Sequence, residues 1–96
     1  MLEEFVVAHP NDGFARYGLA MECASTGDTP AAVENYEKLL VSHPEYVSGY
    51  FQYGQFLAKI SRTDDARRIL KAGIEAAHRS GDQHAAAEME TALAQL

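Results

Sequence analysis

The sequence predicts an all-α protein built from antiparallel pairs of helices that repeat every 34 residues. Three observations lead to this prediction. The dipeptide His9-Pro10 recurs as His43-Pro44, 34 residues later. Apolar residues recur at helical spacing along most of the chain, and no stretch keeps the period of two that is typical of a strand. Alanine, the strongest helix former, is abundant. The three prolines, Pro10, Pro30 and Pro44, all fall where a helix could begin or end.

Length and composition limit the class of protein. The chain has 96 residues, so we expect a single domain over residues 1–96. Its net charge of −6 argues against a nucleic-acid partner, because the phosphate backbone would repel it. The start lacks a basic leader, and no apolar run reaches the length of a membrane span. The single cysteine, Cys23, cannot form an internal disulfide. These features predict a cytoplasmic protein with no membrane partner.

The 34-residue spacing divides the chain into four parts. They are a half repeat over residues 1–10, two full repeats over 11–44 and 45–80, and a closing helix over 81–96. Corresponding positions keep size and polarity rather than identity, as where Tyr36 matches Leu70. Each pair of helices leaves one apolar side that the neighbouring pair is expected to cover.

In the first repeat, the signals for the second helix are the clearest. Thr29 is expected to cap it, and Pro30 fits its first position. Its apolar stripe consists of Ala32, Val33, Tyr36, Leu39 and Leu40. The helix should end before Pro44, because a proline disfavours the helical conformation at the preceding residue.

The second repeat shows the same plan with different limits. The stripe of its first helix consists of Tyr50, Tyr53, Gly54, Leu57 and Ile60. Thr63, followed by two acids that suit the helix dipole, should open the next helix. That helix carries Ala66, Ile69, Leu70, Gly73, Ile74 and Ala77 on one side. Gly81 should end it, and Asp82 should cap the closing helix. The apolar face of the closing helix would hold Ala85, Met89, Ala92, Leu93 and Leu96.

On these residues the chain resembles the tetratricopeptide repeat family, as a small two-repeat protein or domain of bacterial type. The second repeat matches the family motif at Tyr50, Tyr53, Gly54, Leu57, Ala66, Leu70 and Gly73. The first repeat matches at Leu19, Ala20, Ala32, Tyr36 and Pro44, with the turn Gly27-Asp28 between its helices. The departures are Arg16, Cys23, Leu39 and His78, which replace two aromatic residues, a small residue and a proline. The resemblance covers the whole chain and implies a short right-handed solenoid with a C-terminal capping helix.

The first helix of the first repeat carries more apolar residues than its packing needs. Phe14, Tyr17, Met21 and Ala24 form a second stripe, spaced by three, four and three residues. In the family this face lines a concave groove that holds an extended peptide or a partner helix. The resemblance therefore implies partner-binding residues at Phe14, Tyr17, Met21, Phe51 and Gln55. The alternative is that the stripe is buried under residues 1–8 or under a second copy of the chain.

The resemblance implies a protein–protein interaction module, an adaptor or scaffold. One subclass of the family clamps a C-terminal carboxylate with Lys, Asn and Arg. Here the matching positions hold Tyr17, Met21, Gln52 and Gln55, so an apolar or aromatic segment is the expected ligand. The alternative function is a self-associating structural piece, or a fragment of a longer repeat array. A homodimer through the N-terminal region would follow from Leu2, Phe5 and Val6, which repeat the apolar stripe of a second helix.

No catalytic motif accompanies these features, so we expect no enzyme, cofactor or metal. The sequence lacks a Gly-rich phosphate loop and a metal-binding pair of histidines on one helix face. His9 and His43 are expected to complement helix dipoles and to form turns before the prolines. His78 and His84 flank the turn at Gly81, and a metal site there would need further ligands.

The basic residues cluster between Lys59 and Arg79. We expect them to form the solvated face of one helix, and a site for an anion or an acidic peptide is the alternative. Cys23 lies on a packing face, where it should act as a small apolar residue rather than as a reactive thiolate.

Overall fold

The computed structural model describes residues 2–8 and 11–96, which form α-helices and no strand. In chain order the helices are α1 (Leu2–Ala8), α2 (Gly13–Ser25), α3 (Thr29–Ser42), α4 (Val47–Lys59), α5 (Thr63–Ser80) and α6 (Gln83–Ala94). The predicted all-helical class with helices packed in adjacent pairs is confirmed. Met1, His9 and Pro10 lie outside the described residues, and so does the role predicted for His9.

The chain divides into two compact units, Met1–Pro44 and Glu45–Leu96, called here the first and the second unit. The division falls where the 34-residue spacing puts the limit between the two full repeats.

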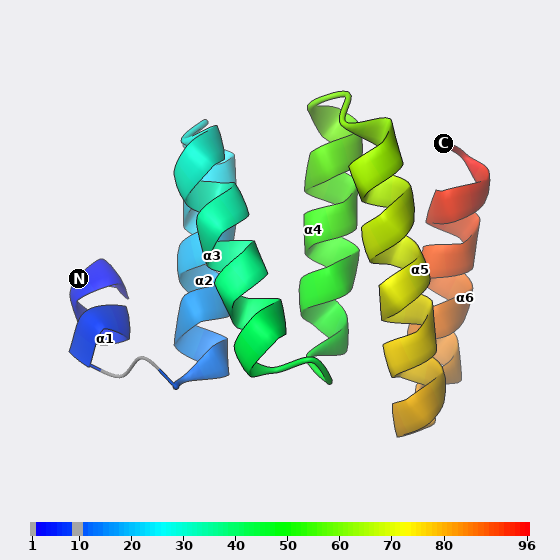
Figure 1. Ribbon diagram of the computed structural model, residues 1–96, viewed down its shortest axis with the longest axis horizontal. Helices are drawn as coiled ribbons and strands as arrows, with labels where there is room; N and C mark the ends of the chain where they lie inside the picture. The colour runs from blue at the N-terminus through cyan, green and yellow to red at the C-terminus, as the bar shows by residue number, and fades with distance from the viewer. Residues whose placement is uncertain (1, 9–10) are drawn as a thin grey trace. The chain divides into compact units, whose positions relative to one another are not determined.

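In the first unit, α2 and α3 run antiparallel as a hairpin (Figure 1). Small side chains at Ala20 and Ala32, both fully buried, let the two axes approach closely. Tyr36 and Leu39 on α3 fill the space around them and are also buried. Gly27 makes the turn with a φ of +82°, a conformation that favours glycine.

Aspartates begin both helices of this hairpin. The Asp12 carboxylate accepts a hydrogen bond from the Ala15 N–H at 3.0 Å, and the Asp28 carboxylate accepts one from the Ala31 N–H at 3.3 Å. The prediction that Thr29 caps α3 is therefore wrong by one residue. Thr29 is the first helical residue, because Asp28 before it offers a charged acceptor that also suits the positive end of the helix. The predicted end is confirmed, since α3 stops at Ser42.

Helix α1 has seven residues and packs against α2. Val6 of α1 is buried and forms a small cluster with Ala15 and Leu19 of α2. Cys23, one turn further along α2, packs against this cluster and is partly buried. Helix α1 thus covers the side of α2 that carries Ala15, Leu19 and Cys23.

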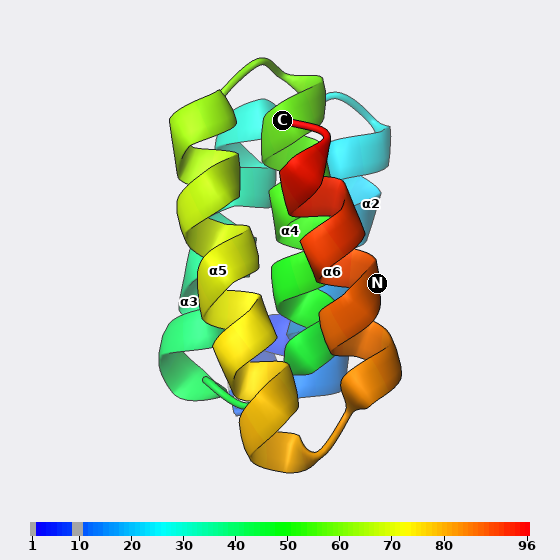
Figure 2. The same cartoon turned by 90° about the vertical axis from the view of Figure 1, so that its right-hand side faces the viewer.

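In the second unit, α5 contacts both α4 and α6, and α6 also contacts α4 (Figures 1 and 2). Gly73 lies where the three helices meet. A Cβ atom at Gly73 would be 2.5 Å from Cβ of Tyr50 on α4 and 2.5 Å from Sδ of Met89 on α6. A Cβ atom at Gly54 would be 2.6 Å from Cδ2 of Leu70. The absence of side chains at these two glycines is what allows the helices to approach so closely.

The closing helix α6 buries a narrower face than the sequence predicts. Met89 is fully buried as expected, but its buried neighbour is Ala86 rather than Ala85. Leu96, predicted to belong to the apolar face, lies beyond the end of the helix and is exposed. The reason is geometric: among the described helices α6 packs only against α5 and α4, so a single narrow stripe is removed from water.

The turns of the second unit differ from each other. Gly81 ends α5 with a φ of +75°, and the Asp82 carboxylate accepts a hydrogen bond from the Ala85 N–H at 3.0 Å, as predicted. Between α4 and α5, Ser61 takes a φ of +66° although it is not a glycine. The side chains of Tyr46 and Arg62, which precede α4 and α5, make no capping hydrogen bond.

Candidate functional site

The predicted binding stripe of the first unit lies on the face of α2 that points away from α1. Phe14 is 76% exposed and Met21 is 38% exposed, whereas Tyr17 between them is half-buried. At 100° per residue, these three side chains fall on a different side of α2 from Ala15 and Leu19, which α1 covers. The described part of α1 therefore packs on another side of α2 than this stripe.

Tyr17 lies near Tyr36, a buried residue of α3. Burial, with smaller contributions from Tyr17 and Cys23, raises the pKa of the Tyr36 phenol to about 12. A phenol that is held neutral by burial stabilises the hairpin only in its protonated form. Tyr17 is half-buried, so Phe14 and Met21 are the more accessible members of the stripe.

In the second unit, the predicted residues lie on α4, where Phe51 is half-buried and Gln55 is exposed. Gln55 also lines a pocket of about 400 Å³ that the sequence does not reveal. The pocket is lined from α4, α5, α6 and the residues just after α6, by Gly54, Gln55, Ala58, Lys59, Leu70, Ala92, Gln95 and Leu96. The only sign of this pocket in the sequence is the small size of Gly54, Ala58 and Ala92, which leaves a space that larger side chains would fill.

A smaller pocket of about 280 Å³ in the first unit lies beside α1. Arg16, one of its lining residues, donates a hydrogen bond from Nη1 to Oδ1 of Asn35 at 2.9 Å. Asn35 in turn donates from Nδ2 to the Ala31 carbonyl at 2.8 Å. At its edge, Lys38 pairs with Glu34 at 2.9 Å, and this hydrogen bond lowers the pKa of the Glu34 carboxyl. The polar groups of this pocket thus largely satisfy one another.

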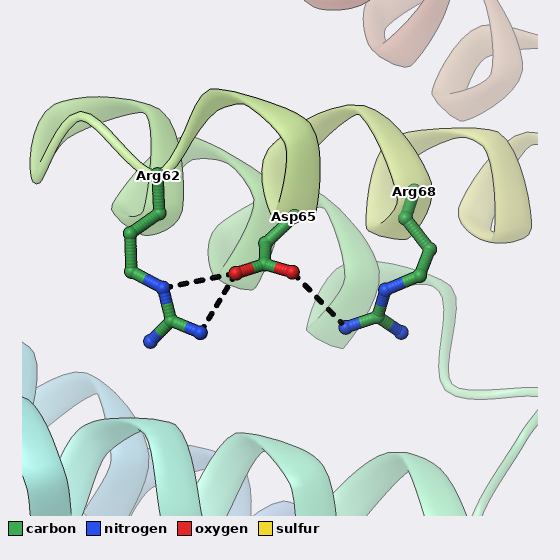
Figure 3. A network of polar contacts seen from close by, with 3 residues as sticks. All are labelled: Arg62, Asp65 and Arg68. Carbon is green, nitrogen blue, oxygen red and sulfur yellow. Dashed lines mark hydrogen bonds and ion pairs between the residues drawn. The ribbon is translucent and has the colours of Figure 1, made fainter.

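Three of the six basic residues between Lys59 and Arg79 form ion pairs near the start of α5, and Figure 3 shows two of them, Arg62 and Arg68, on either side of Asp65. Asp65 accepts from Nε and Nη2 of Arg62 at 3.0 and 2.7 Å, and Nη2 of Arg68 lies 3.9 Å from its other oxygen. Arg67 pairs with Asp64 at 3.1 Å. Each of these contacts joins residues three positions apart near the start of α5. The arrangement fits the solvated face expected from the sequence, because three of the six basic charges already have an acidic neighbour.

Two solved structures are similar to this chain over most of its length. Both are tetratricopeptide repeat domain proteins from Salinibacter ruber. The solution NMR structure matches with a TM-score of 0.84 and 34% identity over 90% of this chain and 87% of that one. The crystal structure matches with a TM-score of 0.79 and 33% identity over 88% and 93%. The chain belongs to the tetratricopeptide repeat family. No protein-family model and no curated protein matches its sequence.

The positions where this tetratricopeptide repeat chain departs from the family motif have structural explanations. Arg16 bonds to Asn35, Cys23 packs against the cluster of α1 and α2, and Leu39 is fully buried. His78 replaces the proline that ends α3 in the first repeat. With an ordinary backbone N–H at that position, α5 continues to Ser80 and is 18 residues long, whereas α3 has 14.

Two histidines and the cysteine outside the binding stripe have defined surroundings. Nε2 of His43 lies 3.0 Å from the Asn11 carbonyl oxygen, a contact that sequence reasoning missed. His84 lies 3.4 Å from Glu88 one turn along α6. Burial, together with Asp28, Glu22 and Glu3, raises the pKa of the Cys23 thiol and so disfavours the thiolate. Among the described residues, no group of three His, Cys, Asp or Glu side chains could hold a metal ion.

In the described part of the chain, every helix is too short or too polar to cross a membrane.

Proposed function

We propose that residues 1–96 act as one tetratricopeptide repeat domain that binds a segment of a partner protein. The binding residues are Phe14, Tyr17 and Met21 on α2, and Phe51 and Gln55 on α4, the faces that line the concave groove in this family. The observation that supports this proposal is the exposure of Phe14 and Met21 on a face that the described part of α1 leaves open. Aromatic side chains that are free in solution and buried in a complex contribute strongly to binding.

The chemistry of the exposed stripe defines the partner segment. Two apolar side chains and a tyrosine favour an apolar or aromatic segment, either extended or helical, over a charged one. The protein works by binding and not by catalysis, in the cytoplasm and without a cofactor. No nucleic acid or membrane takes part.

The test replaces Phe14 and Met21 together with alanine. Partner capture, measured by pull-down from a cell lysate and mass spectrometry, should be lost, while the melting temperature should hardly change because exposed side chains contribute little to stability. Val41→Ala is the matched control, since Val41 is an apolar residue of the same unit and is 80% exposed. The control should keep both capture and stability. A large fall in melting temperature, or full capture by the double variant, would contradict the proposal.

Self-association is the second candidate, and an exposed phenylalanine on α1 favours it. Phe5 is 42% exposed although it lies on a helix that packs against α2. A dimer through this region would cover Phe5 on both chains. Light scattering at micromolar concentration tests it: a mass of one chain that does not change with concentration, with unchanged stability after deletion of residues 1–8, rules the dimer out.

A further inference from the structure

The pocket beside α1 in the first unit is lined by residues of three helices, α1, α2 and α3. Its volume is about 280 Å³. Val6, Leu19 and Ala31 form its apolar part, and the first two are buried. Cavities that hold bound ligands begin at about 300 Å³, so this pocket suits a molecule of the size of an amino acid.

Both basic residues of an otherwise acidic unit line this pocket. Residues 1–44 contain seven aspartates and glutamates, but their only lysine or arginine residues are Arg16 and Lys38. Lys38 pairs with Glu34 at 2.9 Å, and both side chains are mostly exposed. The two other charges of the lining are Arg16 and Glu3, and among the described residues neither forms an ion pair. One positive and one negative charge thus border the same space without reaching each other.

Arg16 is held in place by neutral groups rather than by a carboxylate. Its Nη1 donates to Oδ1 of Asn35 at 2.9 Å, and the Asn35 amide is itself oriented by its hydrogen bond to the Ala31 carbonyl at 2.8 Å. A guanidinium has several N–H donors, and this contact uses only one of them. The contact is partly buried, where a hydrogen bond to a charged group is stronger than in water. The remaining donors of Arg16 are therefore suited to bind a carboxylate.

We infer that this pocket binds a free α-amino acid with a short aliphatic side chain, as a zwitterion. The carboxylate of the ligand pairs with the Arg16 guanidinium, and its ammonium pairs with the Glu3 carboxylate. Its aliphatic side chain packs against Val6 and Leu19. The site lies beside α1 and not on the binding stripe of α2, so it is independent of the proposed function.

Charge complementarity decides between possible occupants. A simple anion would face the like charge of Glu3 in a unit rich in acidic residues, and a simple cation would face the like charge of Arg16. An uncharged apolar molecule would leave both charges without a partner. A zwitterion meets both charges at once, and its own net charge of zero matches the balanced lining. In a peptide the two terminal charges lie further apart, which favours a free amino acid.

The experiment titrates the full chain, labelled with ¹⁵N, with L-valine and with three probes that each lack one feature. Isovalerate lacks the ammonium, isobutylamine lacks the carboxylate, and glycine lacks the side chain. At millimolar concentration L-valine should cause saturable shifts of the amide signals of Arg16, Leu19 and Asn35, and glycine should cause none. Isobutylamine should bind about ten-fold more weakly than L-valine, because the charged hydrogen bonds to Arg16 are lost. Isovalerate should bind about two- to five-fold more weakly, because Glu3 is exposed.

Three variants locate the site. Arg16→Tyr restores the aromatic residue of the family motif, so it should give a well-dispersed spectrum and should no longer bind L-valine. Glu3→Gln should bind L-valine and isovalerate with equal affinity, because the contact with the ammonium is lost. Glu22→Gln is the control: it removes an exposed carboxylate of α2 that does not line the pocket, and should bind L-valine as the unmodified chain does.

Three results would overturn the inference: no saturable shift with L-valine, equal affinity of the unmodified chain for L-valine and isovalerate, or L-valine binding that survives Arg16→Tyr. The first would mean that the pocket holds only water and that Arg16 stabilises the hairpin through Asn35. The second would mean that the site binds carboxylates in general. The variant with Phe14→Ala and Met21→Ala should still bind L-valine when it loses partner capture, so the failure of either proposal can be told from the failure of the other.

Discussion

The two units share one 34-residue pattern but are stabilised by different interactions. In the first unit, both helices of the hairpin begin with a capping aspartate, and His43 bonds to the loop before α2. In the second unit, α4 and α5 lack a capping side chain, but three helices meet around Gly73 with almost no space between them. Local hydrogen bonds at helix ends therefore contribute more to the first unit, and tertiary packing contributes more to the second.

The helix lengths show the same contrast. Pro44 stops α3 through local stereochemistry, because a proline cannot continue the helix. His78 at the matching position imposes no stop, so α5 extends by more than a turn until Gly81 ends it. The residue at this position, proline in the first repeat and histidine in the second, thus affects the length of the helix. The longer α5 provides the surface against which α6 packs.

The largest expected effect is on the packing of the second unit. Gly73→Leu should lower the free energy of unfolding by about 3 kcal/mol, because the new side chain would overlap Cβ of Tyr50, which moves only with its backbone. Thermal unfolding followed by circular dichroism measures this. Ala72→Leu, at the preceding residue of α5, is the control: Ala72 is only partly buried, so stability should change by less than about 0.5 kcal/mol. Equal stability of both variants would show that the three helices are not tightly packed at Gly73.

The second largest effect is expected at high pH, where the first unit should lose more stability than the second. The pKa of Tyr36 is raised from 10.0 to about 12 in the folded chain, so folding favours the protonated phenol. Its contribution is complete below pH 10 and is lost as the pH rises from 10 to about 12, by at most about 2–3 kcal/mol. In the second unit, burial also raises the pKa of Tyr50, but Arg79 opposes the shift.

Urea denaturation at pH 8 and pH 11 provides the measurement. The decrease in unfolding free energy between pH 8 and pH 11 should become smaller in Tyr36→Phe than in Tyr50→Phe. If both variants lose stability between these pH values as steeply as the unmodified chain, buried tyrosines are not what makes the fold sensitive to alkali.

The smallest effect concerns the caps of the first unit. Asp12→Ala and Asp28→Ala should each cost about 1 kcal/mol, because each leaves one helix N–H without its acceptor. Asparagine at either position should retain most of the stability, since its amide oxygen can replace the carboxylate. Arg62→Ala, at the start of α5 in the second unit, removes no cap and should cost less than about 0.5 kcal/mol in the same urea measurements. A cost at Arg62 as large as that at Asp28 would remove the contrast between the units.

The sequence was sufficient to predict features that depend on local chemistry. The repeat spacing, the end of α3 before Pro44, the end of α5 at Gly81 and the cap at Asp82 all follow from backbone preferences of single residues, and the structure agrees. The cap of α3 was assigned to Thr29 instead of Asp28, because both residue types cap helices and pattern alone does not rank adjacent candidates.

Features that depend on contacts between helices were beyond the sequence. The pocket next to Gln55 exists because residues from three helices converge, and the small size of Ala92 has no visible meaning until α6 is placed beside α4. The contact between His43 and Asn11 joins residues 32 positions apart. The proposed stripe on α2 could be read from helical spacing, but its exposure depends on which side of α2 receives α1.

The turn at Ser61 shows that a repeat can keep its turn conformation with a residue other than glycine. Gly27 and Gly81 have left-handed backbones at the two other tight turns, and Ser61 takes the same conformation with a side chain. For a non-glycine residue that conformation costs only about 1–2 kcal/mol. Ser61 lies 34 residues after Gly27, so the second repeat keeps the backbone path of the first turn although the glycine that a sequence pattern would recognise is missing there.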